Sequence, residues 1–313
     1  MAGVQRAGRD RVQAPRARLI MRLAIIVPFR DEARLLPALL GSLAGQTRPP
    51  ENLLLVDDGS RDGSHALAAA FAREHSYARV LRRPPRPRAR DRLAGAPELR
   101  AFEWALAALD APWDVVAKLD ADLRLPAGML AAIEARFEAD PQLGIAGPAL
   151  LSIDEAGRDV SHRTRPEHVE GAARFYRRAC LHQIAPIPPI LGWDTIDEAR
   201  ARLRGWRTAG GAVGEEPVLH LRPMGSHDGA LRAFRRWGAC AWGYGEHPLH
   251  VVLVAGRSLL EPPVVLGGAS YFAGWAAAGL RGSPRAEPEL RAFVRRDQLD
   301  RIARRLSGRS NAA

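Results

Sequence analysis

The chain has 313 residues, of which 47% are apolar, so it is long enough to bury one large core with a smaller appendage. Its two cysteines, Cys180 and Cys240, show neither disulfide nor zinc-finger spacing, which fits a reducing cytoplasm. The net charge of +11 rests on arginines in a chain rich in alanine and proline with a single lysine, a bias that a GC-rich coding sequence produces. Because no RNA-binding, zinc-finger or basic heptad pattern accompanies the charge, nucleic acid is not a predicted partner.

The first 20 residues contain five arginines and no apolar segment, so they do not resemble a secretory signal. We expect residues 1–20 to form a disordered tail. Met21 stands directly before the first strand pattern and is an alternative start of the chain.

The next part of the chain alternates short apolar runs with segments of helical periodicity. Strands are expected at residues 23–27, 53–56, 78–81, 115–119 and 144–151. Helices are expected at residues 31–44, 62–74 and 126–138. This alternation is typical of a doubly wound α/β fold with a mostly parallel sheet covered on both faces. A surface loop rich in proline and arginine is expected at residues 82–92.

The second half of the chain has a looser pattern. Helices are expected at residues 171–182, 195–206 and 229–242, and a strand at residues 218–221. Residues 262–280 carry no charge, but glycines and prolines interrupt them, so they favour a buried or membrane-surface helix over a spanning one. Arg257, Arg281 and Arg285 flank this segment, which suggests peripheral attachment to an anionic membrane.

Two acidic clusters directly follow predicted strands. Asp57 and Asp58 come after residues 53–56, and Asp120 and Asp122 come after residues 115–119. Ligands of an open parallel sheet bind at the carboxyl ends of its strands, and alternate residues of an extended backbone point the same way. Paired carboxylates of this kind suit Mg²⁺ or Mn²⁺. The structural alternative for the first cluster is an N-cap and turn before the helix that follows.

Three segments stand in an order typical of one enzyme family. They are Ile25-Ile26-Val27-Pro28-Phe29-Arg30-Asp31-Glu32, Val56-Asp57-Asp58-Gly59-Ser60 and Leu119-Asp120-Ala121-Asp122. Together they resemble the N-terminal signatures of glycosyltransferase family 2. The resemblance implies a GT-A fold and transfer of a sugar, with inversion, from a UDP- or GDP-linked donor to a hydroxyl of a glycan or lipid-linked acceptor.

The resemblance also implies roles for individual residues. The nucleotide-sugar pocket would be lined by Pro28, Phe29, Arg30, Glu32, Asp58, Asp120 and Ala121. Within this set Asp58 would bind the base, while Asp122, helped by Asp120, would hold Mg²⁺ or Mn²⁺ on the diphosphate. His220 follows a predicted short strand and is either a further metal ligand or a buried core histidine.

The predicted transfer needs a base that takes the proton of the acceptor hydroxyl. Family members carry an acidic Glu-Asp motif at a helix start in the second half, and Gly192-Trp193-Asp194 resembles it, with Trp193 in place of the glutamate. Asp194 is therefore the predicted base. The structural alternative is that Asp194 is an N-cap with Asp197 as a capping-box partner.

The resemblance divides the chain into three parts. Residues 21–225 would form the GT-A domain, with nucleotide binding in residues 21–151 and acceptor binding in residues 152–225. Residues 226–313 would form a helical extension attached to the inner face of the plasma membrane. The Gln-x-x-Arg-Trp motif of processive members is absent, which favours single additions in the synthesis of bacterial cell-surface or exopolysaccharide glycans. The competing functions are a sugar nucleotidyltransferase, whose Gly-rich phosphate loop is missing after the first strand, and a non-catalytic nucleotide-sugar-binding protein.

Overall fold

The computed structural model describes residues 21–84, 95–153, 158–159, 165–211, 216–222, 229–260 and 263–307. The tail expected at residues 1–20 and residues 85–92 of the expected basic loop lie outside these ranges.

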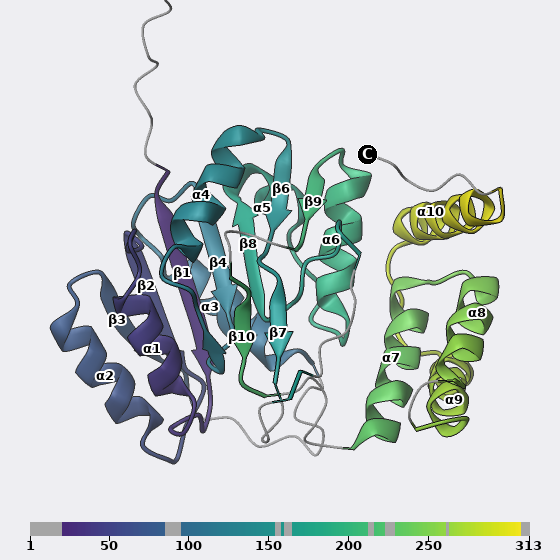
Figure 1. Ribbon diagram of the computed structural model, residues 1–313, viewed down its shortest axis with the longest axis horizontal. Helices are drawn as coiled ribbons and strands as arrows, with labels where there is room; N and C mark the ends of the chain where they lie inside the picture. The colour runs from purple at the N-terminus through teal and green to yellow at the C-terminus, as the bar shows by residue number, and fades with distance from the viewer. Residues whose placement is uncertain are drawn as a thin grey trace, which may run out of the picture.

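A seven-stranded sheet forms the centre of the molecule (Figure 1). In spatial order its strands are β3 (Ala78–Arg82), β2 (Asn52–Asp57), β1 (Leu23–Phe29), β4 (Val115–Leu119), β8 (Ala173–Arg177), β6 (Leu143–Ala146) and β9 (Arg207–Ala209). The first four are parallel to one another, whereas β8 is antiparallel to both of its neighbours. The predicted mostly parallel sheet is therefore confirmed.

Helices cover both faces of this sheet. The helices on one face are α1 (Leu36–Ala44), α2 (Ser64–Glu74) and α4 (Met129–Ala139), and those on the other are α3 (Pro97–Ala107), α5 (Arg178–Ile184) and α6 (Trp193–Leu203). In β1, Ile25 and Val27 point into the first core, while Ala24 and Ile26 point into the second. A strand that is apolar on both faces must be covered on both, which is the doubly wound arrangement.

A small second sheet lies against the carboxyl end of the first. It consists of β5 (Leu123–Arg124), β10 (Val218–His220) and β7 (Leu150–Ser152). Strand β10 is antiparallel to β5, and His220 is paired with Leu123. This pairing brings a distant part of the chain next to the segment that follows β4.

Two predicted elements differ from the observed ones. The strand expected at residues 144–151 is divided into β6 and β7, because Gly147 and Pro148 lie between them. The helix expected at residues 171–182 begins only at α5, and its first part is strand β8. A short apolar run cannot be assigned to helix or strand by periodicity alone, and Arg174 in β8 is a buried charge that hides the strand pattern.

The C-terminal part of the chain is helical. Its helices are α7 (Ala230–Tyr244), α8 (Pro248–Ser258), α9 (Leu266–Leu280) and α10 (Pro288–Leu306). Helices α7 and α9 pack closely through glycines, since a Cβ atom at Gly238 would lie 1.8 Å from the carbonyl oxygen of Tyr271, and one at Gly274 would lie 2.0 Å from that of Arg235. In the described part of the chain, none of the helices has both the length and the hydropathy required to cross a bilayer.

Helix α10 joins this bundle to the sheet by packing on α6 (Figure 1). Leu290 of α10 shares an apolar cluster with Ile196 of α6. Alongside it, Arg200 donates from Nε to Glu287 at 2.7 Å. The C-terminal bundle therefore contacts α6, the helix that carries Asp194, through α10.

Two glycine-to-alanine substitutions test the packing of α7 against α9. Gly238→Ala places a methyl group against the backbone of α9, so we expect the free energy of unfolding to fall by about 1–3 kcal/mol or more. The matched control is Gly256→Ala on α8, where no atom lies within 4 Å of the new Cβ. Since alanine favours helix over glycine, this control should raise the stability by about 0.5–1 kcal/mol. Urea unfolding of both variants measures the difference, and equal effects would contradict the close packing.

Candidate active site

The loops that follow β1 and β2 are tied together by hydrogen bonds. The Oγ atom of Ser60 accepts the backbone N–H of Asp31 at 3.0 Å, and the Oγ atom of Ser64 accepts that of Glu32 at 2.7 Å. Asp31 has a φ of 56°, a left-handed conformation that these contacts stabilise. The first two sequence motifs therefore form one unit at the carboxyl edge of the sheet.

The two aspartates after β2 have different partners. The carboxylate of Asp57 accepts the N–H of Ser60 at 2.7 Å, so it closes the turn. Asp58 is 4% exposed and accepts a hydrogen bond from Arg83 at 2.7 Å. Helix α2 is capped by Gly63 without a side-chain bond. The turn interpretation thus holds for Asp57, whereas neither aspartate is an N-cap.

Asp120, Asp122 and His220 form a cluster whose candidate ligand atoms all lie within 4.8 Å of one another. The two aspartates lie between β4 and β5, and the pairing of β10 with β5 brings His220 beside them. Two carboxylates and an imidazole are a donor set that can hold a divalent cation. His220 is 6% exposed and its Nε2 atom lies 3.4 Å from Asp122, a position that suits both a metal ligand and a buried histidine satisfied by a carboxylate.

Charge interactions set the ionisation of this cluster. Burial raises the pKa of Asp122, but the hydrogen bond and charge of His220 and the charge of Arg222 outweigh it, so the net shift is downward. Burial lowers the pKa of His220, yet Asp122 and Asp120 raise it by more. The Nδ1 atom of His220 is buried and has no hydrogen-bond partner in the described ranges. A buried polar atom of this kind requires a ligand or water.

Arg222 connects the first sequence motif, residues 25–32, with the cluster of Asp120, Asp122 and His220. It donates from Nη1 to Glu32 at 2.9 Å, and the same nitrogen lies 3.5 Å from Asp122. Glu32 is one of the residues predicted to line the pocket. Its side chain therefore lies at this edge of the sheet.

Lys118 of β4 links the cluster to β8. Its ammonium group donates to Asp120 and, at 3.0 Å, to the carbonyl oxygen of Gly171. It also lies 5.6 Å from the ring centroid of Trp193. Burial lowers the pKa of Lys118, but Asp120 and other carboxylates raise it by more, so the lysine is charged.

Asp194 reaches the same edge from α6. A Cβ atom at Gly171 would lie 2.7 Å from its Oδ2 atom, so the carboxylate rests on this glycine. Its backbone oxygen accepts a hydrogen bond from Arg174 at 2.6 Å. The N-cap of α6 is Gly192, with no side-chain cap bond, and Asp194 is the second residue of the helix. The N-cap interpretation of Asp194 is therefore wrong.

The remaining predicted residues lie in or near the core. Pro28, Phe29 and Ala121 are buried, and the side chains of Phe29 and Ala121 belong to the apolar cluster under α1 and α4. Only the backbone of Phe29 faces the motif unit, where its oxygen accepts the N–H of Asp58 at 2.9 Å. Arg30 is half-buried at the end of β1.

Sequence reasoning missed Lys118 and Glu170 as members of this site. It gave weight to residues that follow strands, but β8 is antiparallel to β4, so the residues that precede β8 lie at the same edge. Burial raises the pKa of Glu170, and its other charged neighbours include Asp194 and His220. The signal for Lys118 was available, because it is a lone charge inside an apolar strand.

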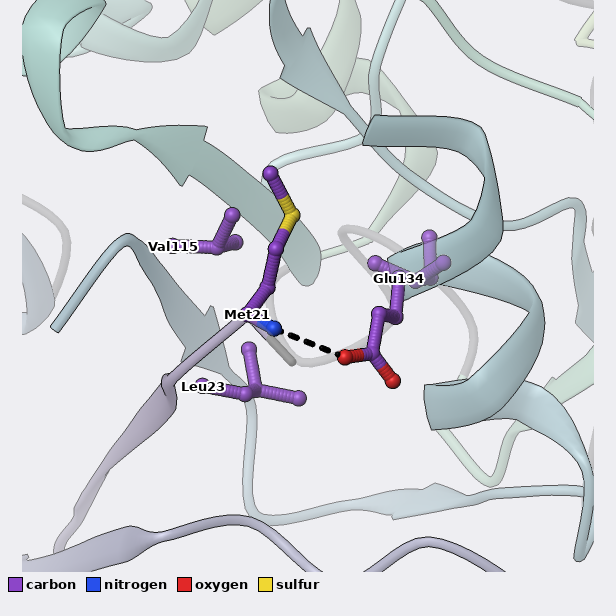
Figure 2. A pocket seen from close by; sticks show the side chains of 5 residues that line it. Met21, Leu23, Val115 and Glu134 are labelled. Atoms are coloured by element: carbon purple, nitrogen blue, oxygen red, sulfur yellow. Dashed lines mark hydrogen bonds between the residues drawn. The ribbon is translucent and has the colours of Figure 1, made fainter. Parts of the chain in front are cut away.

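A small cavity lies elsewhere, at the amino ends of β1 and β4 (Figure 2). Met21, Leu23, Val115 and Glu134 line it, and the N–H of Met21 donates to Glu134 at 3.1 Å. Its volume of about 10 Å³ holds about one water molecule. This cavity is therefore too small for a substrate and lies at the edge opposite the acidic cluster.

Solved structures of low sequence identity share this architecture. The mannosyltransferase PcManGT from Pyrobaculum calidifontis, in complex with GDP-Man and Mn²⁺, superposes with a TM-score of 0.52 at 18% identity, over 92% of this chain and 80% of that one. A TarS fragment from S. aureus in complex with UDP-GlcNAc has a TM-score of 0.52 at 16% identity, over 84% of this chain and 74% of that one. The protein thus has the GT-A fold.

The sequence comparisons then define the family. The family model of glycosyl transferase family 2 matches residues 24–190, which is more than half of the chain. An undecaprenyl-phosphate mannosyltransferase from Micrococcus luteus is 35% identical over 102 residues, which span 33% of this chain and 38% of that protein. The chain belongs to glycosyl transferase family 2. It matches little more than a third of the length of the mannosyltransferase.

The substitution Asp122→Asn tests whether the cluster of Asp120, Asp122 and His220 binds a metal ion. It preserves the size of the side chain but removes one anionic ligand, so we expect the affinity for Mn²⁺ to fall by at least about tenfold. Binding is measured by electron paramagnetic resonance of free Mn²⁺. The matched control is the exposed Asp110→Asn, which should bind as the wild type does.

If Asp122 serves only to neutralise His220 and Arg222, the result will differ. The melting temperature of Asp122→Asn would then fall while Mn²⁺ binding, if any, stayed unchanged. That pattern would exclude Asp122 as a metal ligand.

Proposed function

We propose that the protein is a metal-dependent, inverting glycosyltransferase that moves a sugar from UDP or GDP to a hydroxyl of a glycan or lipid-linked acceptor. The observation that carries this proposal is the position of Asp194 beside Gly171, whose carbonyl oxygen accepts a hydrogen bond from the same Lys118 that donates to Asp120 of the cluster. The relatives support it, since one is a mannosyltransferase by name and PcManGT was solved with GDP-Man and Mn²⁺.

The donor would occupy the edge formed by β1, β2 and β4. Asp58, which accepts a hydrogen bond from Arg83, would also accept hydrogen bonds from the nucleotide base. Asp122, Asp120 and His220 would hold the cation, because their candidate ligand atoms all lie within 4.8 Å of one another and form a mixed set of carboxylates and imidazole. Because imidazole is a ligand of first-row transition ions, the set favours Mn²⁺ over Mg²⁺. The bound cation supplies charge neutralisation of the diphosphate leaving group.

Asp194 is the proposed base. It would accept the proton of the acceptor hydroxyl as that oxygen bonds to the anomeric carbon and the nucleoside diphosphate departs. It lies in the first turn of α6, at the same edge of the sheet as Lys118. Arg174 donates a hydrogen bond to the backbone oxygen of Asp194 and so helps to hold this residue at the edge of the sheet.

The acidic neighbours of Asp194 are poor candidates for the base. Asp197 is fully buried between Arg174 and Tyr176, and burial raises its pKa to about 6. Glu198 is 2% exposed and accepts hydrogen bonds from His168 and from the backbone of Val169. The side chains of Asp197 and Glu198 both hold α6 on the sheet. Asp194 is therefore the acidic residue of this segment that we propose as the base.

We also propose a role for each part of the chain and a location for the enzyme. Residues 21–225 would act as the GT-A domain, with donor binding in residues 21–151 and acceptor binding in residues 152–225. Residues 226–313 would attach the enzyme to the inner face of the plasma membrane. Such a place in the cytoplasm would suit synthesis of bacterial cell-surface glycans from a lipid-linked acceptor.

Asp194→Asn and Asp194→Ala test the role of the base. General-base catalysis contributes about 10² to 10⁴ in rate, so both variants should lose transfer by that order. The carboxylate makes no N-cap bond, so each variant should keep its stability to within about 1 kcal/mol and its affinity for the nucleoside diphosphate. The measurements are single-turnover transfer, melting temperature and nucleoside-diphosphate titration.

The matched control is Glu289→Gln, which removes an acid from the first turn of α10 and should transfer sugar normally. Normal transfer by Asp194→Asn would exclude the assigned base. Nucleotide-sugar binding by the wild type without any transfer to a panel of acceptors would identify a non-catalytic binding protein instead.

A further inference from the structure

Helix α8 carries an apolar stripe on its exposed side. Leu249, Val252, Leu253 and Leu260 recur at helical spacing along α8 and the turn after it, and they are 44%, 53%, 49% and 82% exposed. An ordinary surface helix points its apolar stripe at the core and its polar residues at solvent. Helix α8 instead exposes an apolar stripe to solvent on its outer face.

The inner face of α8 is already packed. Val251 and Ala255 are buried in a cluster with Phe234 of α7 and Tyr271 of α9. The core of the C-terminal bundle therefore forms without the exposed residues of α8. These residues are not needed to fill that core.

The exposed apolar surface continues onto the turn between α8 and α9 and along α9. Val264, Val265 and Leu266 are all more than half exposed at a position where turns usually carry glycine or polar residues. Phe272 and Leu280 extend it along α9. We call these residues together with the stripe of α8 the α8–α9 surface. It lies at the end of the molecule opposite α2 (Figure 1).

The charges around this surface are mainly basic. Arg257 lies on α8 within it, Arg235 is exposed on α7, and Arg281 is exposed directly after α9. From Pro248 to Leu280 the sequence contains one basic residue that is always charged, Arg257, and one acidic residue, Glu261, so the three arginines leave a net positive charge. An apolar face with a basic rim complements a layer that has an apolar interior and anionic head groups.

We propose that the α8–α9 surface docks the protein on an anionic lipid bilayer, with the turn at Val264 and Val265 and the outer face of α8 inserted at the level of the head groups. The sequence had suggested attachment through residues 262–280. The glycine-lined part of that segment instead packs on α7, so the bilayer would contact its ends and α8.

A second copy of the chain is a poorer occupant. Symmetric pairing through this surface would bring Arg235, Arg257 and Arg281 towards the same residues of the second copy, and Glu261 is the single acidic residue of the sequence between Pro248 and Leu280 that could offset them. Like charges brought together at an interface oppose association, whereas anionic head groups attract them.

The proposal rests on the proposed function and deepens it, since it names the surface within residues 226–313 that would contact the membrane and bring a lipid-linked acceptor to the enzyme. Helix α10 connects the docked bundle to α6, the helix of Asp194. Lipid binding itself requires neither donor nor acceptor, so it can be measured apart from sugar transfer.

The test is co-sedimentation with vesicles of phosphatidylglycerol and phosphatidylcholine, compared with vesicles of phosphatidylcholine alone. The wild-type protein should bind the anionic vesicles more tightly, and salt should weaken the binding. Leu253→Glu and Leu260→Glu should each reduce binding by about tenfold or more, because each removes a large apolar side chain from the surface. Arg281→Gln should reduce binding to anionic vesicles alone by about fivefold.

Leu67→Glu is the matched control, because Leu67 is an exposed leucine on α2 at the other end of the molecule. It should bind as the wild type does, and unchanged melting temperatures should show that all variants are folded. Asp194→Asn should also bind normally, so a failure of catalysis and a failure of docking are distinguished.

Absence of binding to anionic vesicles, or equal binding by Leu253→Glu and the wild type, overturns the proposal. A dimer in size-exclusion chromatography that Leu253→Glu converts to a monomer, without vesicle binding, overturns it in favour of a second copy.

Discussion

Carboxylates gathered at the carboxyl edge of the sheet repel one another, and the structure depends on how this repulsion is offset. Asp58 faces Arg83, Asp120 faces Lys118, and Asp122 faces both His220 and Arg222. The cations come from three segments, the end of β3, strand β4 and the end of β10, so the edge forms only when the main sheet and the small second sheet have assembled. A divalent ion held by Asp120, Asp122 and His220 would add to this balance.

A second charge pair positions the candidate base. Arg174 of β8 is fully buried and donates to Asp197, to the carbonyl oxygen of Val169 and to that of Asp194. A buried ion pair contributes little net stability against an apolar replacement, but removal of one partner leaves an uncompensated charge and is costly. We infer that this pair fixes the place of α6, because it binds the backbone of Asp194 directly and leaves its carboxylate at the edge.

The sequence patterns were sufficient for the parallel part of the fold and for most of the cluster. Apolar runs located β1 to β4, and the rule that ligands lie after parallel strands found Asp58, Asp120 and Asp122. That rule has no counterpart for an antiparallel strand, so Glu170 and Gly171, which precede β8, were not recognised. The pairing of β10 with β5 is a long-range contact that local periodicity does not encode, and His220 therefore had two open interpretations. Helix α8 was missed since its exposed stripe is apolar.

The central claim is that a nucleoside diphosphate binds at this edge through a cation held by Asp122. The most direct measurement is the melting temperature of the protein with UDP or GDP, each with and without Mn²⁺. A ligand at 100 times its dissociation constant stabilises the folded state by about 2.7 kcal/mol. The account predicts a rise of several degrees with one of the two nucleotides in the presence of Mn²⁺ and none in its absence. The same rise without metal, or no rise with either nucleotide, would contradict it.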